Sequence, residues 1–224
     1  MDELLCATGI YKHYTLGDSD LEVLKGVDFA VARGEIVAIV GASGVGKSTL
    51  LHILGGLDHP SSGTVAIDGV DVFSLSDADR AQLRNQKVGF VFQFHHLLRD
   101  FTALENVMMP LMISGVSAAE AREPARDLLQ SVDLEKRLDH LPAELSGGEA
   151  QRVAVARALI AQPAVVLADE PSGNLDVVSS EALHELIWEL AQSRNQTFVI
   201  VTHDQHLAER ADRVVHMQDG CIVS

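Results

Sequence analysis

Short apolar runs alternate along the chain with stretches in which apolar residues recur at helical spacing. Ile36–Val40 and residues 164–168 and 197–201 are apolar almost throughout, which is typical of parallel strands buried on both faces of a sheet. Between the last two runs, residues 183–190 repeat leucine and isoleucine at positions that share one helix face. Strands that alternate with helices predict an α/β fold with a parallel sheet.

The rest of the pattern divides the chain into a strand-rich first third and a helical middle. Residues 28–32 and 64–69 resemble strands that end in turns, and Val88–Phe92 is a further short strand. Residues 49–54 are expected to be helical. From about Gln93 to Ala161 the pattern is mostly helical and amphipathic. We therefore predict one domain over residues 1–224, with a helical subdomain at about 93–161 inserted between strands of the sheet.

Composition narrows the possible partners. The chain has 224 residues with 17 Lys and Arg against 32 Asp and Glu, a formal net charge of −15. Such an acidic chain is not expected to hold nucleic acid or anionic lipid on a general basic surface. Residues 80–160 carry ten basic and ten acidic residues, so this neutral middle is where we expect a protein partner. The acidic remainder is interpreted first as a solvated face.

Membrane attachment is expected to depend on a partner. No segment reaches the roughly 18 uninterrupted apolar residues that a membrane-spanning helix needs. The two cysteines, Cys6 and Cys221, make no disulfide framework and match no metal-binding spacing. These features predict a soluble protein of the reducing cytoplasm.

A glycine-rich segment follows the strand at Ile36–Val40 and matches the pattern G-x-x-x-x-G-K-[ST]. Its glycines let backbone N–H groups point inwards at phosphate oxygens, and the helix behind it adds its positive end. Lys47 is expected to neutralise the β- and γ-phosphates, and Ser48 to bind Mg²⁺. The chance alternative, an ordinary glycine-rich turn, is disfavoured by the preceding strand and the following helix. The predicted nucleotide-binding residues are Gly41, Ala42, Ser43, Gly44, Val45, Gly46, Lys47, Ser48 and Thr49.

Polar residues follow three other predicted strands directly. Asp169 and Glu170 end one, Gln93 follows another, and His203 follows a third. Because parallel strands bring their carboxyl ends to the same edge of a sheet, these side chains are expected near the bound phosphates. Asp169, Gln93 and Ser48 are the predicted metal ligands. Glu170, His203 and Gln93 are the predicted catalytic residues, with Glu170 acting on the attacking water. Taken alone, His203 could equally be a polar cap on its strand.

A second helix start also has the features of an anion site. Ser146, Gly147, Gly148 and Glu149 precede an apolar helical stretch, where a serine cap and bare glycine N–H groups can face an anion. An ordinary capped helix explains these residues about equally well.

Taken together, six motifs occur in one order: residues 41–48, Gln93, residues 145–149, residues 165–170, residues 174–176 and His203. This order resembles the nucleotide-binding subunits of ABC transporters, over essentially the whole chain. In that family the motifs are the Walker A, Q-loop, signature, Walker B, D-loop and switch histidine. The resemblance implies a P-loop NTPase core of RecA type, with an N-terminal antiparallel β-subdomain and an inserted α-helical subdomain.

The same resemblance implies ATP as the nucleotide, Mg²⁺ as the metal, and two subunits that pack head to tail around two ATP molecules. Ser146, Gly147, Gly148 and Glu149 of one subunit would then face the γ-phosphate bound by the other, and Asp176 would lie in the same interface. An aromatic near the N-terminus stacks on adenine in this family. Tyr14 occupies that place, although Tyr11 is close and a packed strand tyrosine is also possible.

Within the family, residues 83–87, 93–107 and 167–176 are similar to the lipoprotein-releasing ATPases of Gram-negative bacteria. That similarity implies a peripheral subunit on the cytoplasmic face of the inner membrane. Two integral membrane subunits would dock near residues 93–107, and only they would contact the lipoprotein cargo. ATPases of macrolide-efflux and cell-division type share much of this pattern and remain alternatives. A non-transport ABC ATPase acting on DNA or ribosomes, a binding-only regulatory subunit and a small-molecule P-loop kinase agree less well with the residues present.

Overall fold

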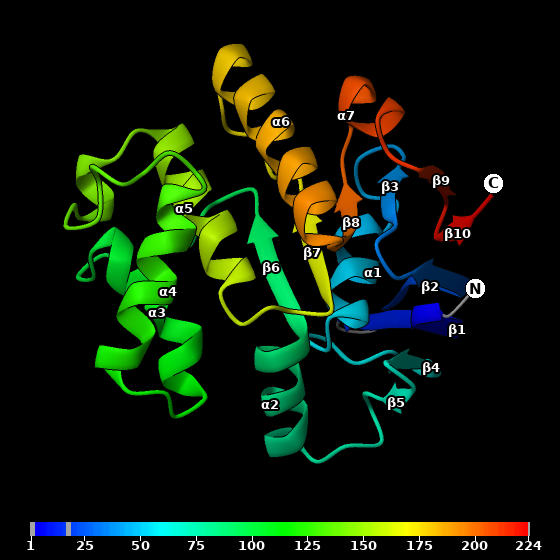
Figure 1. Ribbon diagram of the computed structural model, residues 1–224. Helices are drawn as coiled ribbons and strands as arrows, with labels where there is room; N and C mark the ends of the chain where they lie inside the picture. Colours follow the sequence, from blue (N-terminus) through cyan, green and yellow to red (C-terminus); the bar gives the residue numbers. More distant parts are fainter. Residues whose placement is uncertain (1–2, 17–18, 224) are drawn as a thin grey trace.

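The computed structural model describes residues 3–16 and 19–223, which form two sheets with helices packed around them (Figure 1). The smaller sheet is antiparallel, with the strand order β2-β1-β4-β5, and the larger has the order β10-β9-β3-β8-β7-β6. The smaller sheet comprises β1 (Glu3–Leu16), β2 (Ser19–Ala32), β4 (Ser62–Ile67) and β5 (Val70–Asp71). The larger comprises β3 (Ile36–Val40), β6 (Val88–Phe92), β7 (Val165–Asp169), β8 (Thr197–Val201), β9 (Arg213–Gln218) and β10 (Cys221–Ile222).

The larger sheet is buried on both faces, as its apolar runs predict. Its strands β6, β7, β8, β3 and β9 pair in parallel. Along β7, Val165 and Leu167 enter the core that lies towards the antiparallel sheet. Val166 and Ala168 enter the opposite core, among residues of the helices. Since side chains alternate between the faces of a strand, a strand covered on both sides must be apolar at every position.

Seven α-helices and one 3₁₀ turn lie within the described ranges 3–16 and 19–223. They are α1 (Lys47–Leu54), α2 (Asp77–Lys87), α3 (Ala103–Ile113), α4 (Ala118–Gln130), η1 (Pro142–Glu144), α5 (Gly147–Leu159), α6 (Val177–Arg194) and α7 (Gln205–Glu209). Figure 1 shows α3, α4 and α5 gathered on one side of the parallel sheet. This grouping supports the predicted helical subdomain, whose limits at about 93–161 stay a prediction. Its first helix begins only at Ala103, and the preceding ten residues form bends, a turn and irregular backbone.

The sequence analysis does not predict helix α2, and it does not give the limits of strands β1 and β2. Helix α2 has few apolar residues and buries Arg80 alone, so it has no apolar stripe to reveal it. Strands β1 and β2 are each 14 residues long and pair along most of their length, with several register shifts. These irregularities interrupt the period of two by which a half-buried strand is recognised.

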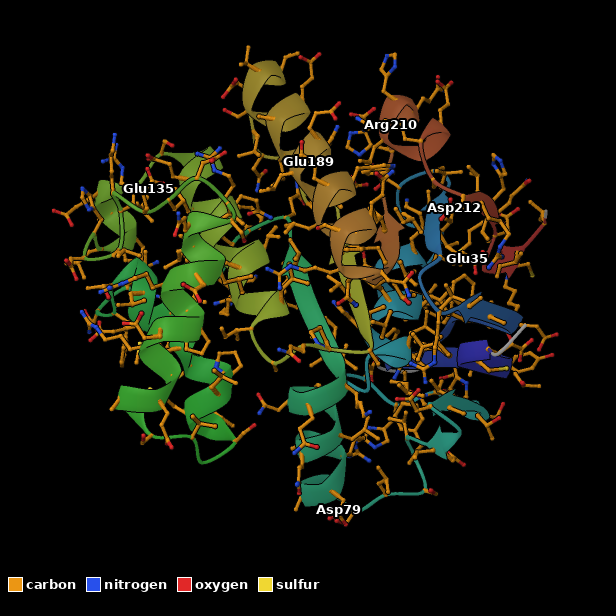
Figure 2. The ribbon with its side chains drawn as sticks, viewed as in Figure 1. Glu35, Asp79, Glu135, Glu189, Arg210 and Asp212 are labelled. Carbon is orange, nitrogen blue, oxygen red and sulfur yellow. The ribbon has the colours of Figure 1, made fainter. Side chains whose placement is uncertain are left out.

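The acidic side chains are spread over the surface rather than gathered at one site. Figure 2 labels Asp79, Glu135 and Glu189 on three different parts of the fold, and all three are exposed. Arg210 pairs with Glu185 on α6, and its guanidinium lies 5.0 Å from the ring centre of Trp188. Asp79 and Glu189 belong to the acidic part of the chain outside residues 80–160 and are exposed, while the interpretation of that whole part as a solvated face stays a prediction.

Among the helices that the structure describes, none has the length and apolar character required to cross a membrane.

A close backbone contact between Gly89 of β6 and Ala158 of α5 fixes the packing of the helix on the strand. A Cβ atom at Gly89 would lie 2.3 Å from the backbone oxygen of Ala158, so Gly89→Ala must push the helix and strand apart. Overpacking of this kind costs about 1–3 kcal/mol. We expect that loss in the free energy of unfolding, measured by urea denaturation with the fluorescence of Trp188, the single tryptophan.

The matched control for this variant is Gly147→Ala. Like Gly89, Gly147 has no left-handed φ, and a Cβ atom there would meet Leu175 Cδ2 at 3.5 Å, an ordinary van der Waals contact, so its substitution adds no clash. An unchanged stability of the Gly89→Ala variant would contradict the tight packing of α5 on β6.

Candidate functional site

The glycine-rich segment forms a loop between β3 and α1 that encloses a cavity of about 650 Å³. Gly44 and Gly46 have φ angles of +81° and +103°, which a residue without a Cβ adopts at little cost. Lys47 is buried, and its ammonium donates to the carbonyl oxygens of Gly41 and Ala42 at 2.9 Å. The loop is therefore shaped as an anion cradle with a cation held inside it.

Two of the predicted metal ligands meet beside this cavity: Ser48 lines it, and Asp169 lines a neighbouring hollow. The Ser48 hydroxyl donates to Asp169 Oδ1 at 3.0 Å, joining the start of α1 to the end of β7. Burial raises the pKa of the Asp169 carboxyl, and the Ser48 hydrogen bond opposes that rise. A hydroxyl beside a poorly solvated carboxylate fits a Mg²⁺ site, because Mg²⁺ binds few protein oxygens together with water and phosphate. No cluster of three His, Cys, Asp or Glu residues able to hold a metal occurs in the described part of the chain.

Glu170 and His203 face each other across the ends of β7 and β8. Glu170 Oε2 lies 2.8 Å from His203 Nδ1 and also accepts from the His203 backbone N–H at 3.3 Å. The backbone of Glu170 is left-handed, with a φ of 47°, a conformation that is strained for a residue with a side chain. This turn brings the carboxylate to the cavity, which both residues line.

Gln93 lies between that cavity and a second one. It lines the 650 Å³ cavity and also a neighbouring hollow of about 430 Å³, together with Phe94, His96 and Asp169. Its side-chain amide donates to Asn174 Oδ1 at 3.1 Å, and Asn174 Nδ2 donates back to the Gln93 carbonyl oxygen at 3.0 Å. In this structure the amide of Gln93 thus faces Asn174, and its predicted metal contact stays a prediction.

Of the two tyrosines on β1, Tyr14 is the better placed for the nucleotide. Its hydroxyl donates to Asp58 Oδ2 at 2.8 Å, and the Lys12 ammonium lies 4.6 Å from its ring centre. Burial and Asp58 raise the pKa of Tyr14, while a hydrogen bond with Thr49 of the cradle opposes that rise. Tyr11 instead places its hydroxyl against Gly26. Stacking of Tyr14 on adenine stays a prediction.

The second predicted anion site is a fully formed capping box. Ser146 caps α5, its hydroxyl accepts from the Glu149 N–H, and Glu149 Oε2 accepts from the Ser146 N–H at 2.8 Å. Arg137 donates to the other oxygen of Glu149 at 2.7 Å. Among the described residues, Ser146, Gly147, Gly148 and Glu149 are not part of the cradle cavity's lining. The capping box satisfies the start of α5 within the chain, and its role as a second anion site stays a prediction.

Asp176, at the end of the loop that follows Glu170, caps α6 by accepting from the backbone N–H of Ser179. The start of α5 lies beside this region, because a Cβ atom at Gly148 would lie 3.3 Å from Ser179. Within the same loop the Ser172 hydroxyl lies 2.8 Å from His184 Nε2 on α6. Burial lowers the pKa of His184. Sequence reasoning missed the contacts of Ser172 and Asn174, since their partners are 12 and 81 residues away.

The sequence and the fold of this chain are similar to those of known proteins. The family model described as "ABC transporter" matches residues 24–173. The chain therefore belongs to the ABC transporter family, and it is an ATPase of the ABC type. The predicted fold class is confirmed by solved ABC cassettes. One is the dimeric post-hydrolysis state of the ATP-binding cassette MJ0796 bound to ADP and Pi, with a TM-score of 0.90 and 38% identity, over 98% of this chain and 97% of that one.

Curated relatives point to one branch of the family. The lipoprotein-releasing system ATP-binding protein LolD of Legionella pneumophila (strain Paris) is 54% identical, over 99% of this chain and 97% of its own length. The LolD protein of Geobacter metallireducens is also 54% identical, over the full length of both chains. The predicted resemblance to lipoprotein-releasing ATPases is thereby confirmed at the level of sequence.

The capping box at α5 predicts a pH dependence of stability. Hydrogen bonds from the Ser146 backbone and from Arg137 lower the pKa of Glu149 to about 2 from 4.5. A carboxylate with a depressed pKa in the folded state stabilises the protein above its unfolded pKa and loses that contribution as the pH falls through its folded pKa. We expect Glu149→Gln to lower the free energy of unfolding most above about pH 5, with the difference vanishing as the pH falls towards about 2.

Urea denaturation of the two proteins across this pH range measures the difference. Glutamine can still close the capping box, so the comparison isolates the charge. The control is Glu105→Gln, because Glu105 closes the capping box of α3 through hydrogen bonds with Thr102. A difference for Glu149→Gln that does not change with pH would contradict this account.

Proposed function

We propose that this chain is the Mg-dependent, ATP-hydrolysing subunit of an inner-membrane complex that releases outer-membrane lipoproteins to a periplasmic carrier. The observation that carries the proposal is the grouping of Lys47, Ser48, Glu170 and His203 around one cavity, in a chain 54% identical to a LolD protein over its full length. The chain would work on the cytoplasmic face of the membrane, held there by integral partners.

In the proposed mechanism the cradle binds the phosphates, Asp169 helps to hold the metal, and Glu170 acts on the attacking water. Backbone N–H groups of the loop and the Lys47 ammonium bind the β- and γ-phosphates. Ser48 and Asp169, with Gln93, would hold Mg²⁺, which supplies charge neutralisation on the phosphate oxygens. Tyr14 would stack on the adenine ring at the outer end of the cavity.

Glu170 is proposed to orient the attacking water and to accept its proton. Its carboxylate is positioned by the left-handed turn at its own backbone and by two hydrogen bonds with His203. His203 is largely exposed, while the Glu170 side chain is 19% exposed. An exposed imidazole beside a sheltered carboxylate can contact the γ-phosphate and hold the carboxylate in place at the same time.

Two chains are needed to complete each site in this proposal. Each chain has a cradle and a capped start of α5, and Ser146 to Glu149 do not line the cradle cavity among the described residues. A head-to-tail pair would place Ser146 and Gly147 of one chain on the γ-phosphate bound by the other, with Asp176 in the same interface. The related cassette MJ0796 is dimeric in its ADP- and Pi-bound structure, which supports this arrangement.

An exposed apolar surface beside Gln93 is proposed as the docking site for two membrane subunits of LolC and LolE type. Phe94 is 65% exposed, and Ile113 on α3 is 68% exposed. They line two adjoining hollows of about 430 and 400 Å³, which share Leu57 and Phe92. Exposed large apolar groups around a hollow are typical of a protein-binding surface. A short apolar helix from each membrane subunit would fit there, and the lipoprotein itself would contact only those subunits.

Replacement of the proposed water-orienting group tests the hydrolytic mechanism. We expect Glu170→Gln to lower the ATP turnover rate by about 10²–10⁴-fold, because an amide cannot accept the proton, while ATP binding is retained. Phosphate release and equilibrium binding of a fluorescent ATP analogue measure the two quantities. Glu185→Gln, which changes an exposed carboxylate paired with Arg210, is the matched control. Undiminished turnover of Glu170→Gln would contradict the proposed role.

Capture of the native complex tests the proposed partners. The Glu170→Gln chain, which should hold ATP in the closed pair, is recovered from detergent-solubilised membranes in Mg-ATP. Recovery of two related membrane proteins with large periplasmic domains, carrying lipoprotein, is the expected result. One membrane protein in two copies would favour the efflux or cell-division relatives. Ribosomes or DNA without a membrane protein would overturn the transport function.

Substitutions on the surface define the docking site in the same experiment. We expect Ile113→Asp to reduce recovery of the membrane proteins while leaving ATP binding intact. Leu21→Asp is the matched control, because Leu21 is 52% exposed on β2, outside the proposed docking surface. Equal recovery with both variants would contradict docking at α3.

A further inference from the structure

The loop between Glu170 and Asp176 holds Gln93 through a pair of side-chain amides. Gln93 Nε2 donates to Asn174 Oδ1, and Asn174 Nδ2 donates to the Gln93 carbonyl oxygen. Gly173 permits this close approach, because a Cβ atom there would lie only 3.0 Å from Gln93 Nε2. The two hydrogen bonds and the glycine together fix both the backbone and the side chain of Gln93.

The same loop is tied to the hydrolytic carboxylate. The Gly173 N–H donates to the Glu170 carbonyl oxygen at 3.0 Å, and the Leu175 N–H donates to that of Ser172 at 3.0 Å. These consecutive turns leave little freedom between Glu170 and Asn174. The loop therefore links Gln93 to the backbone of Glu170 through consecutive hydrogen bonds.

Gln93 cannot hold Asn174 and turn towards the metal ligands with the same amide. Ser48 and Asp169 are hydrogen-bonded to each other, while the Gln93 amide is directed to Asn174. Yet Gln93 lines the cavity that contains Ser48, and it lines the neighbouring hollow beside Asp169. A rotation of the Gln93 side chain away from Asn174 is enough to change its partner.

We propose that Asn174 is a positioning residue for Gln93, holding its amide against the 170–176 loop until the metal and nucleotide compete for it. Binding of the metal then requires the amide pair to open, which frees the loop next to Glu170. This inference rests on the proposed role of Gln93 as a metal ligand. It adds a competing partner for that residue inside the same chain.

Direct metal binding separates this role from a general structural one. Mn²⁺ replaces Mg²⁺, a non-hydrolysable ATP analogue is present, and electron paramagnetic resonance measures free Mn²⁺. Asn174→Ala removes the competing partner, so the Mn²⁺ dissociation constant falls by about threefold to tenfold, the range for the loss of one net hydrogen bond. Asn174 is exposed, so this variant is expected to fold.

Two comparisons complete the test. In the Gln93→Ala background, Asn174→Ala has no further effect on Mn²⁺ affinity, because the residue on which it acts is absent. Ser172→Ala loosens the same loop by removing its contact with His184, and it leaves Mn²⁺ affinity unchanged. Unchanged or weaker Mn²⁺ binding by Asn174→Ala, or an equal effect in the Gln93→Ala background, overturns the proposal.

A second readout uses the chain without nucleotide or metal. The Gly173 and Leu175 amides donate hydrogen bonds within the loop, so their hydrogen exchange rises severalfold in Asn174→Ala, and unchanged exchange there overturns the proposal. The metal role of Gln93 and the competition by Asn174 are distinguished by different results. If Gln93→Ala binds Mn²⁺ as tightly as the native chain, the metal role of Gln93 falls and the competition falls with it. If only Asn174→Ala is without effect, the metal role stands and Asn174 has no part in it.

Discussion

Burial of the parallel sheet on both of its faces is the constraint from which the site follows. Apolar side chains dominate β3, β7 and β8, because most residues of these strands enter one core or the other. Polar groups can then appear only where the strands end. Parallel pairing brings those ends to one edge, so that Asp169 lies opposite Val201 in the register. The cradle, Glu170 and His203 meet at that edge as a result.

The sequence predicts this part of the molecule well because its signals are local. A wholly apolar run identifies each central strand, and the polar residue that follows identifies the edge. The cradle is recognised from glycines whose positive φ angles the structure contains at Gly44 and Gly46. For these residues the local sequence pattern is enough to predict where they lie in the fold.

The remainder depends on contacts that no local pattern reveals. Helix α2 is polar on nearly every side, and β1 with β2 pairs through several register shifts. Gln93 was predicted near the metal from its position after β6, but its hydrogen-bond partner Asn174 lies 81 residues further along the chain. The same holds for Arg157, which donates to the carbonyl oxygens of His95 and His96. Such pairs follow from the packing of separate elements, and one sequence does not encode them at a fixed spacing.

Lys47 shows how the cradle tolerates a cycle of binding and release. A buried ammonium without acceptors would be costly, since a desolvated cation loses the hydrogen bonds of water. Here the carbonyl oxygens of Gly41 and Ala42 accept from it. When product leaves, the Lys47 ammonium therefore keeps two hydrogen-bond acceptors. The loop does not need to rearrange in order to solvate this charge between turnovers. Carbonyl oxygens of the loop replace water around the ammonium, so the cavity keeps its shape for the next nucleotide.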